Sequence, residues 1–300
     1  MAMRLLTGTA SWTDPTLLAC GRFYPPEVRS AEARLRFYAS RFPMAEVDSS
    51  YYAMPTAENA YLWTQRTPED FVFNIKAFRL FTGHQTPLSS LPADIRRELP
   101  DWPEPVIYHD RMPADLRDEL WRRYQLALEP LRMADKLGAV HFQFPPWIRR
   151  DARGRARVAD CARRMEDNLV SVEFRHRSWF ESPSATADTL AFERELGVAH
   201  TVVDSPQGFE NTVPAVWECT HPELTLLRLH GRNTATWNVS GAASSGRFQY
   251  EYSEQELAEL AERFSRLAAQ SAQAHAVFNT NFEDQGMRNA AAFAAALAPA

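Results

Sequence analysis

Val170-Ser171-Val172-Glu173-Phe174-Arg175 is the stretch of this 300-residue chain that decides the fold. Successive side chains of a strand alternate between two faces, so Ser171, Glu173 and Arg175 share one face and the apolar residues take the other. Ala45-Glu46-Val47-Asp48 repeats the pattern with two carboxylates. Buried ions destabilise a fold unless they are paired. Charges that point inward at the ends of several strands therefore indicate a functional pocket.

Outward from this stretch, hydrophobic periodicity predicts eight short strands separated by helical patterns. The predicted strands lie near residues 4–9, 44–48, 71–76, 139–144, 169–174, 198–203, 224–229 and 274–279. Ser30 and Thr56 are expected to begin two of the helices, and Ser253 with Glu256 forms a capping box before another. A long helix carrying Leu116 to Leu137 is expected to end at Gly138.

Strict alternation of strand and helix predicts an α/β fold, a single (β/α)8 TIM-type barrel over residues 1–300, because parallel strands need crossover helices. A doubly wound open sheet is the competing fold. No glycine-rich phosphate-binding pattern follows the first strand, where Gly8-Thr9-Ala10-Ser11 stands, so the barrel is favoured.

Two connections are too long to be simple turns. They run from Ala77 to Pro113, after the third strand, and from Gly231 to Tyr252, after the seventh. Loops of this length in a compact domain are usually functional. Because both follow strands, both are expected over the barrel mouth, and 77–113 is a candidate lid.

The composition restricts the possible partners. A net charge of −5 disfavours a broad nucleic-acid interface, because such interfaces depend on clustered Lys and Arg. No stretch approaches a membrane span, and the three cysteines lack metal-type spacing. These features predict a cytoplasmic protein; the oligomeric state stays open.

Short motifs in order along nearly the whole chain resemble the YecE-like family, the domain of unknown function 72. The motifs are Gly8-Thr9-Ala10-Ser11-Trp12, Phe23-Tyr24-Pro25, Glu46-Val47-Asp48-Ser49-Ser50-Tyr51-Tyr52, Phe73-Asn74-Ile75-Lys76-Ala77, Gln143-Phe144-Pro145, Glu173-Phe174-Arg175-His176, Leu229-His230-Gly231-Arg232 and Phe278-Asn279. The resemblance implies a TIM-type barrel and leaves the activity unsettled. The family's likeness to sugar isomerases and barrel endonucleases is a likeness of fold.

Glu46 and Glu173 are the candidate acid and base, because a carboxylate in a shielded pocket can have its pKa tuned toward neutral pH. The alternative is purely structural, with Glu46 paired with Lys76, and Glu173 with Arg175 or Arg228. Lys76 is a candidate catalytic residue, as an anchor for an anion or, less favourably, as a Schiff-base amine. The other possibility for Lys76 is again a structural ion pair.

Further polar and aromatic residues are expected to bind the substrate. Guanidinium forks suit phosphate or carboxylate, amides can orient hydroxyls, and aromatic rings at a mouth can stack on sugars or bases. The candidates are Asp48, Gln143, Arg175, Asp204, Arg228, His230, Arg232, Asn279, Trp12, Tyr51 and Trp237.

No cofactor is assigned, although a divalent metal on Glu46, Glu173, Asp204 and His230 is a weaker possibility. The favoured hypothesis is an enzyme that isomerises or hydrolyses a small anionic substrate, such as a sugar phosphate or a nucleotide-derived sugar. The alternatives are a barrel that binds an anionic metabolite without turnover, and a metal-dependent, nuclease-like protein.

Overall fold

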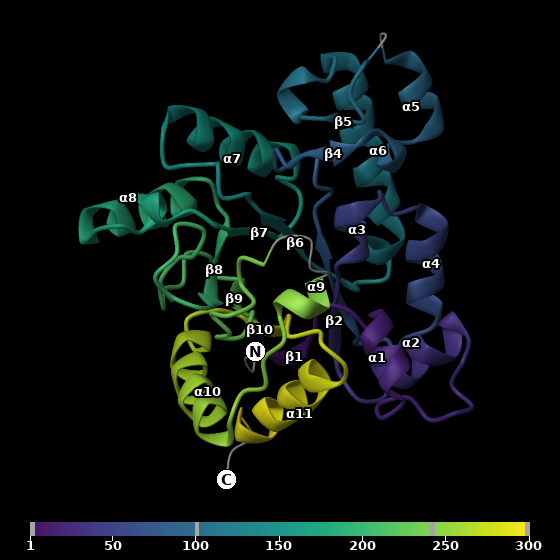
Figure 1. The fold of residues 1–300 in the computed structure, drawn as a ribbon, viewed down its shortest axis with the longest axis vertical. Helices are drawn as coiled ribbons and strands as arrows, with labels where there is room; N and C mark the ends of the chain where they lie inside the picture. Colours follow the sequence, from purple (N-terminus) through teal and green to yellow (C-terminus); the bar gives the residue numbers. More distant parts are fainter. Residues whose placement is uncertain (1–3, 100–101, 240–243, 298–300) are drawn as a thin grey trace.

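Eight parallel strands close into a barrel in the computed structural model, which describes residues 4–99, 102–239 and 244–297 (Figure 1). In chain order they are β1 (Arg4–Thr9), β2 (Met44–Val47), β3 (Val72–Lys76), β6 (Leu137–Gln143), β7 (Val170–Glu173), β8 (Ala199–Asp204), β9 (Leu224–Leu229) and β10 (Gln273–Phe278). Around the barrel their order is β1-β10-β9-β8-β7-β6-β3-β2. The predicted TIM-type barrel is confirmed, and each predicted strand lies within about two residues of its observed bounds.

Helices surround the barrel (Figure 1). The longer ones are α2 (Ala31–Ala39), α4 (Ala57–Gln65), α6 (Ala114–Met133), α7 (Ala152–Arg164), α8 (Pro183–Glu195), α10 (Glu254–Ala268) and α11 (Gln285–Leu297). The shorter ones are α1 (Pro15–Cys20), α3 (Ser49–Tyr52), α5 (Ala93–Glu98) and α9 (Ser244–Arg247), with 3-10 turns η1 (Leu88–Ser90), η2 (His109–Arg111) and η3 (Arg177–Trp179). None of the helices in the described part of the chain has the length and apolarity needed to cross a membrane.

The predicted helix starts are confirmed at atomic detail. Ser30 and Thr56 accept hydrogen bonds from backbone N–H groups of the first turns of α2 and α4. Ser253 and Glu256 form the complete capping box that begins α10. Each of these side chains satisfies a backbone donor that a helix leaves free at its first turn.

The predicted end of the long helix at Gly138 is wrong. Helix α6 ends at Met133, Asp135 takes a positive φ of 53°, and Leu137 begins β6. Gly138 lies inside the strand, where a Cβ atom would come within 2.4 Å of Asn74 Oδ1. The glycine is therefore needed for close packing in the barrel and not for stopping the helix.

The two faces of the barrel strands differ in chemistry although both are buried. In β6, Phe142 stacks on Trp121 of α6 with ring centroids 6.1 Å apart. The preceding residue, His141, points into the barrel, where its Nδ1 lies 2.9 Å from the hydroxyl of Ser171 in β7. Apolar outer faces pack on the helices, and polar inner faces are left to build a site.

The long segment after β3 contains β4 (Thr86–Pro87) and β5 (Val106–Ile107), which pair antiparallel. It is anchored to α6, because Phe81 stacks on Trp121 at 3.7 Å between centroids and Asp94 pairs with Arg123. Its first residues, Arg79 and His84, line the cavity described below. That this segment acts as a lid stays a prediction.

Candidate functional site

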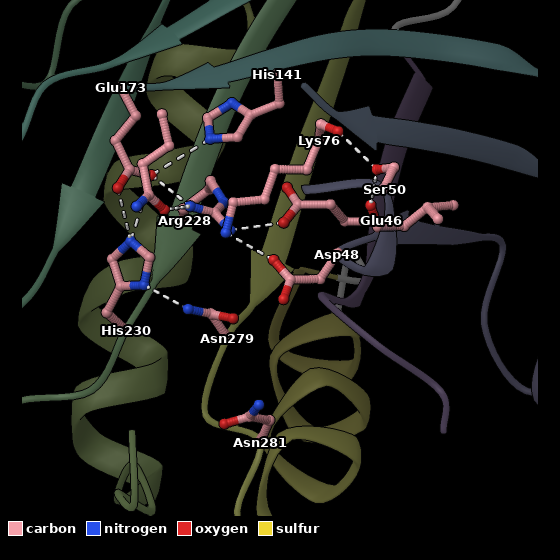
Figure 2. Close-up of polar contacts among 12 residues, drawn as sticks. Glu46, Asp48, Ser50, Lys76, His141, Glu173, Arg228, His230, Asn279 and Asn281 are labelled. Atoms are coloured by element: carbon pink, nitrogen blue, oxygen red, sulfur yellow. Dashed lines mark hydrogen bonds and ion pairs between the residues drawn. The ribbon is translucent and has the colours of Figure 1, made fainter. Parts of the chain in front are cut away.

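A chain of alternating charges made of Glu46, Arg228, Glu173 and Arg175 lies inside the barrel below its mouth. Figure 2 shows its first three members. Arg228 of β9 is completely buried, and its guanidinium lies between two carboxylates: Nη2 donates to Glu46 Oε1 at 2.6 Å and Nη1 donates to Glu173 Oε2 at 2.5 Å. Arg175 continues the chain with its Nε 3.0 Å from Glu173 Oε1. The two carboxylates balance the two guanidiniums, which is what allows these ions to be buried.

His230 and Asn279 connect this chain to the mouth. His230 Nε2 lies 3.2 Å from Glu173 Oε1, and its Nδ1 lies 2.8 Å from Asn279 Nδ2 (Figure 2). Burial lowers the pKa of His230 to about 3, in spite of the neighbouring carboxylate of Glu173. The imidazole is therefore neutral near pH 7, with one nitrogen as donor and the other as acceptor.

The ionisation of Glu173 differs from the sequence expectation. Burial by itself would raise its pKa, but the guanidiniums of Arg228 and Arg175 hold the pKa of Glu173 well below its ordinary value. The expected shift was toward neutral pH. Glu173 is thus a permanently ionised partner of the cations near pH 7, a state that suits electrostatic support and opposes proton donation.

Above the charge chain lies a cavity of about 420 Å³. It is lined by Asp48, Tyr51, Tyr52, Lys76, Arg79, His84, Gln143, Pro145, Pro146, Trp147, Arg175, Asn211, Trp237, Arg247, Phe248 and Asn279. Most of these residues end a barrel strand or lie in the loop that follows it. The cavity therefore lies at the end of the barrel where TIM-type folds carry their active sites, and it has the size of a small-molecule site.

Positive charge exceeds negative charge at this cavity. Lys76 Nζ lies 2.6 Å from Asp48 Oδ1, so these two charges cancel. Arg79 and Arg247 also line the cavity, and no carboxylate of the described residues pairs with either of them. Burial, followed by the fields of Lys76, Arg79 and Arg175, lowers the pKa of the adjacent His84 to about 3. An anion is the charge that this cavity can best accommodate.

Two of the cations that line the cavity also carry an N–H group without a hydrogen-bond partner. These groups are Nη1 of Arg175 and Nε of Arg79, and both are buried and have no partner among the described residues. A buried donor without a partner destabilises the protein.

Aromatic rings form much of the cavity wall. Tyr51 lies under two cations, with Lys76 Nζ 4.7 Å and the Arg79 guanidinium 5.0 Å from its ring centroid. Trp237 lies beside the Arg175 guanidinium, and Trp147 is 53% exposed at the rim. Rings held beside cations provide faces for a flat or sugar-like group that carries a negative charge.

The structure brings most of the predicted residues together and places three apart. Asp48, Tyr51, Lys76, Gln143, Arg175, Trp237 and Asn279 line the cavity, and Glu46, Glu173, Arg228 and His230 lie beneath it. Asp204 and Arg232 instead pair with each other at 2.8 Å in a separate network with Tyr252. Trp12 packs edge-on against Phe73 and Trp63, outside the cavity.

The residues named as possible metal ligands do not fit a metal. The guanidinium of Arg228 lies between the carboxylates of Glu46 and Glu173 and pairs with both, and Asp204 forms an ion pair with Arg232. Among the described residues, no group of three or more His, Cys, Asp or Glu side chains has an arrangement that could hold a metal ion.

Several cavity residues carry no signal in the sequence that would place them at the site. Arg79 and His84 lie in the long segment after β3, and Arg247 and Phe248 lie in the one after β9, where no periodicity assigns a direction to a side chain. His141 is different. It precedes Gln143 by two positions on the inward face of a strand, and its Nε2 lies 3.5 Å from Glu173, so period-two alternation could have identified it.

Comparisons with known proteins agree with this architecture. Residues 6–300 match the family model described as "Protein of unknown function DUF72". The chain is 33% identical over 277 residues to the UPF0759 protein YunF of Bacillus subtilis (strain 168), covering 91% of this chain and 88% of that protein.

Two solved structures, each described as a DUF72 family protein, resemble the whole chain. The one from Enterococcus faecalis V583 has a TM-score of 0.78 at 25% identity, covering 99% of this chain and 96% of that one. The one from Thermotoga maritima MSB8 has a TM-score of 0.74 at 23% identity, covering 98% and 99% respectively. Neither description names an activity.

Proposed function

Starting from the fact that the chain belongs to the DUF72 family of proteins of unknown function, we propose that its barrel mouth binds a small anionic, hydroxylated molecule. A sugar phosphate or a nucleotide-derived sugar has this chemistry. The observation that carries the proposal is the excess of cations at an aromatic-walled cavity. Arg79 and Arg247 both line the cavity and lack a carboxylate partner among the described residues.

The division of roles follows from which groups reach the cavity. Arg79, Arg175 and Arg247 hold the anionic group, since charge-assisted contacts to phosphate or carboxylate are about twice as strong as neutral ones. Gln143 and Asn279 contact hydroxyls, and the rings of Tyr51 and Trp237 cover the ligand. Glu46 and Glu173 lie one layer below, where they keep Arg228 and Arg175 in place.

We further propose that Asp48 and Lys76, rather than Glu46 and Glu173, exchange protons with the substrate in an acid–base isomerisation or hydrolysis. Asp48 is the carboxylate that lines the cavity, and its side chain is 17% exposed, whereas the side chains of Glu46 and Glu173 are 0% exposed. A general base must come within hydrogen-bond reach of the proton that it removes.

Anion binding is tested by calorimetric titration of inorganic phosphate, ribose 5-phosphate and glucose 6-phosphate. Arg79→Met and Arg247→Met should each weaken binding about tenfold, because a hydrogen bond to a charged group contributes about 1.5 to 3 kcal/mol. Arg266→Met is the matched control, since Arg266 is an exposed residue of α10 paired with Glu262. Wild-type binding should also weaken with salt. No wild-type affinity for any of these anions at millimolar concentration would refute the proposal.

A second candidate is a barrel that binds the same anion without turnover. It is favoured by the lowered pKa of Glu173 and by the complete burial of both glutamates. Proton and phosphorus NMR in D2O distinguish the two functions, because isomerisation by proton transfer exchanges carbon-bound hydrogen for deuterium and hydrolysis yields new cleavage products. The enzyme hypothesis expects exchange or cleavage that Asp48→Asn abolishes while phosphate still binds. Tight binding with neither exchange nor cleavage would select the binding protein.

A further inference from the structure

Arg228 determines which end of the Gln143 amide faces the cavity. A guanidinium has N–H donors and no acceptor. Gln143 Oε1 lies 3.3 Å from Arg228 Nη1, so the amide oxygen is the end directed at the arginine. The reverse orientation would place two donors against each other. The NH2 group of Gln143 is therefore left for the cavity that this residue lines.

His230 determines the orientation of the Asn279 amide, but here the NH2 group, and not the oxygen, is the end directed at the partner. Its Nε2 lies 3.2 and 3.3 Å from the two oxygens of Glu173, and an ionised carboxylate can only accept. The proton of the neutral imidazole is thus on Nε2, and Nδ1 is an acceptor. Nδ1 receives its hydrogen bond from Asn279 Nδ2 at 2.8 Å, which turns Asn279 Oδ1 away from the histidine.

The charges that face the His230 ring support this state. They are Glu173, Arg175 and Arg228, and the aromatic rings of Trp237 and Phe248 complete its surroundings. One negative and two positive charges, together with complete burial, oppose a second proton on the ring.

We propose that the buried charge chain fixes the floor of the cavity as one N–H donor at Gln143 and one oxygen acceptor at Asn279, and so selects a ligand that presents a hydroxyl group to Asn279. The inference rests on the proposed function, because it concerns selection in the same cavity. A ligand whose carbonyl or carboxylate oxygen meets Asn279 is rejected, since two acceptors then face each other without water. His230 and Arg228 are positioning residues that act through the two amides.

The orientation is tested first without any ligand. Nitrogen-15 NMR of the histidine rings reports which nitrogen carries the proton, and the His230 signal is identified by its loss in His230→Phe. We expect a neutral ring with its proton on Nε2 from about pH 5 to 8. In Asn279→Asp the carboxylate cannot donate to Nδ1, so the ring should take up a proton or exchange its tautomer. A proton on Nδ1 in the wild type would overturn the inference.

Selection is tested by calorimetry with inorganic phosphate, ribose 5-phosphate, glucose 6-phosphate and fructose 6-phosphate. Asn279→Leu and His230→Phe should leave the phosphate affinity within about twofold and lower the affinity for the preferred sugar phosphate up to about tenfold, the value of one hydrogen bond. Asn59→Leu on the exposed surface of α4 is the matched control. A merely structural role for His230 predicts equal losses for phosphate and sugar phosphate.

The outcomes separate the two proposals. If wild-type protein binds phosphate but prefers none of the sugar phosphates, or if Asn279→Leu keeps the preference, the selection by hydroxyl is refuted and anion binding stands. If wild-type protein binds none of the four probes, the proposed function fails, while the NMR result still decides the orientation of Asn279.

Discussion

Removing the central guanidinium with Arg228→Met should strongly destabilise the fold. The substitution leaves two buried carboxylates, but they are affected unequally. Glu173 keeps Arg175 at 3.0 Å and His230 at 3.2 Å. Among the described residues, Glu46 has no other ion-pair partner, and its Oε2 already lacks a hydrogen bond. The stranded charge is therefore mainly that of Glu46.

Breaking a buried ion pair by removing one partner costs about 3 to 5 kcal/mol. We expect Arg228→Met to lower the free energy of unfolding by this amount, a large part of the roughly 5 to 15 kcal/mol typical of a domain. The double variant Arg228→Met/Glu46→Gln should recover about half of the loss, because the stranded charge is gone and the cost of an unpaired amide is smaller.

Urea denaturation followed by circular dichroism at pH 7 measures these differences. Arg266→Met, which removes an exposed guanidinium, is expected to change the free energy by less than about 0.5 kcal/mol. The loss in Arg228→Met should shrink toward acidic pH, because a buried carboxyl group without a partner can take up a proton. A loss below about 1 kcal/mol, or no recovery in the double variant, would refute the view that the charge chain is a coupled unit.

Three further predictions concern stability. Because the pKa of Glu173 is lowered in the folded protein, its ionised form stabilises the fold fully above about pH 4.5, the ordinary pKa of the group, and this contribution is lost as the pH falls through the lowered folded-state pKa. The difference in the free energy of unfolding between wild type and Glu173→Gln should therefore narrow from pH 7 to pH 3 in urea titrations. A difference that stays constant with pH would contradict this prediction. Phe81→Ala should cost about 3 to 5 kcal/mol by thermal or urea unfolding, because its ring stacks on Trp121, and a loss near zero would show that the segment after β3 is not anchored there. Gly231→Ala should cost more than about 1 kcal/mol, since φ is 79° and a Cβ atom would come within 2.4 Å of Tyr250 Cβ; unchanged stability would show that the loop relaxes freely.

The direction of side chains at strand ends could be predicted from the sequence. Period-two alternation assigns Glu46, Glu173 and Arg175 to an inward face, and strand–helix alternation places that face inside a closed barrel. Both statements depend on local geometry, which a strand imposes whatever surrounds it. Local geometry does not predict partners, however: Asp204 and Arg232 end a strand and begin the next loop as expected, but they pair with each other, and Asp204 also accepts from Tyr252, outside the cavity.

The sequence by itself determined the barrel, its strand order along the chain and the end at which polar groups gather, because hydrophobic period and helix capping are local properties. Only the tertiary structure decided that Arg228 joins Glu46, 182 residues away, to Glu173, 55 residues away. Closure of the barrel brings these three residues together in space. Period-two alternation predicts the face of the strand to which a side chain points, but not the residues on other strands that it contacts. The folded structure likewise decided the ionisation of Glu173 and the arrival of Arg79 and Arg247 at the mouth, since both depend on charges brought together from distant parts of the chain.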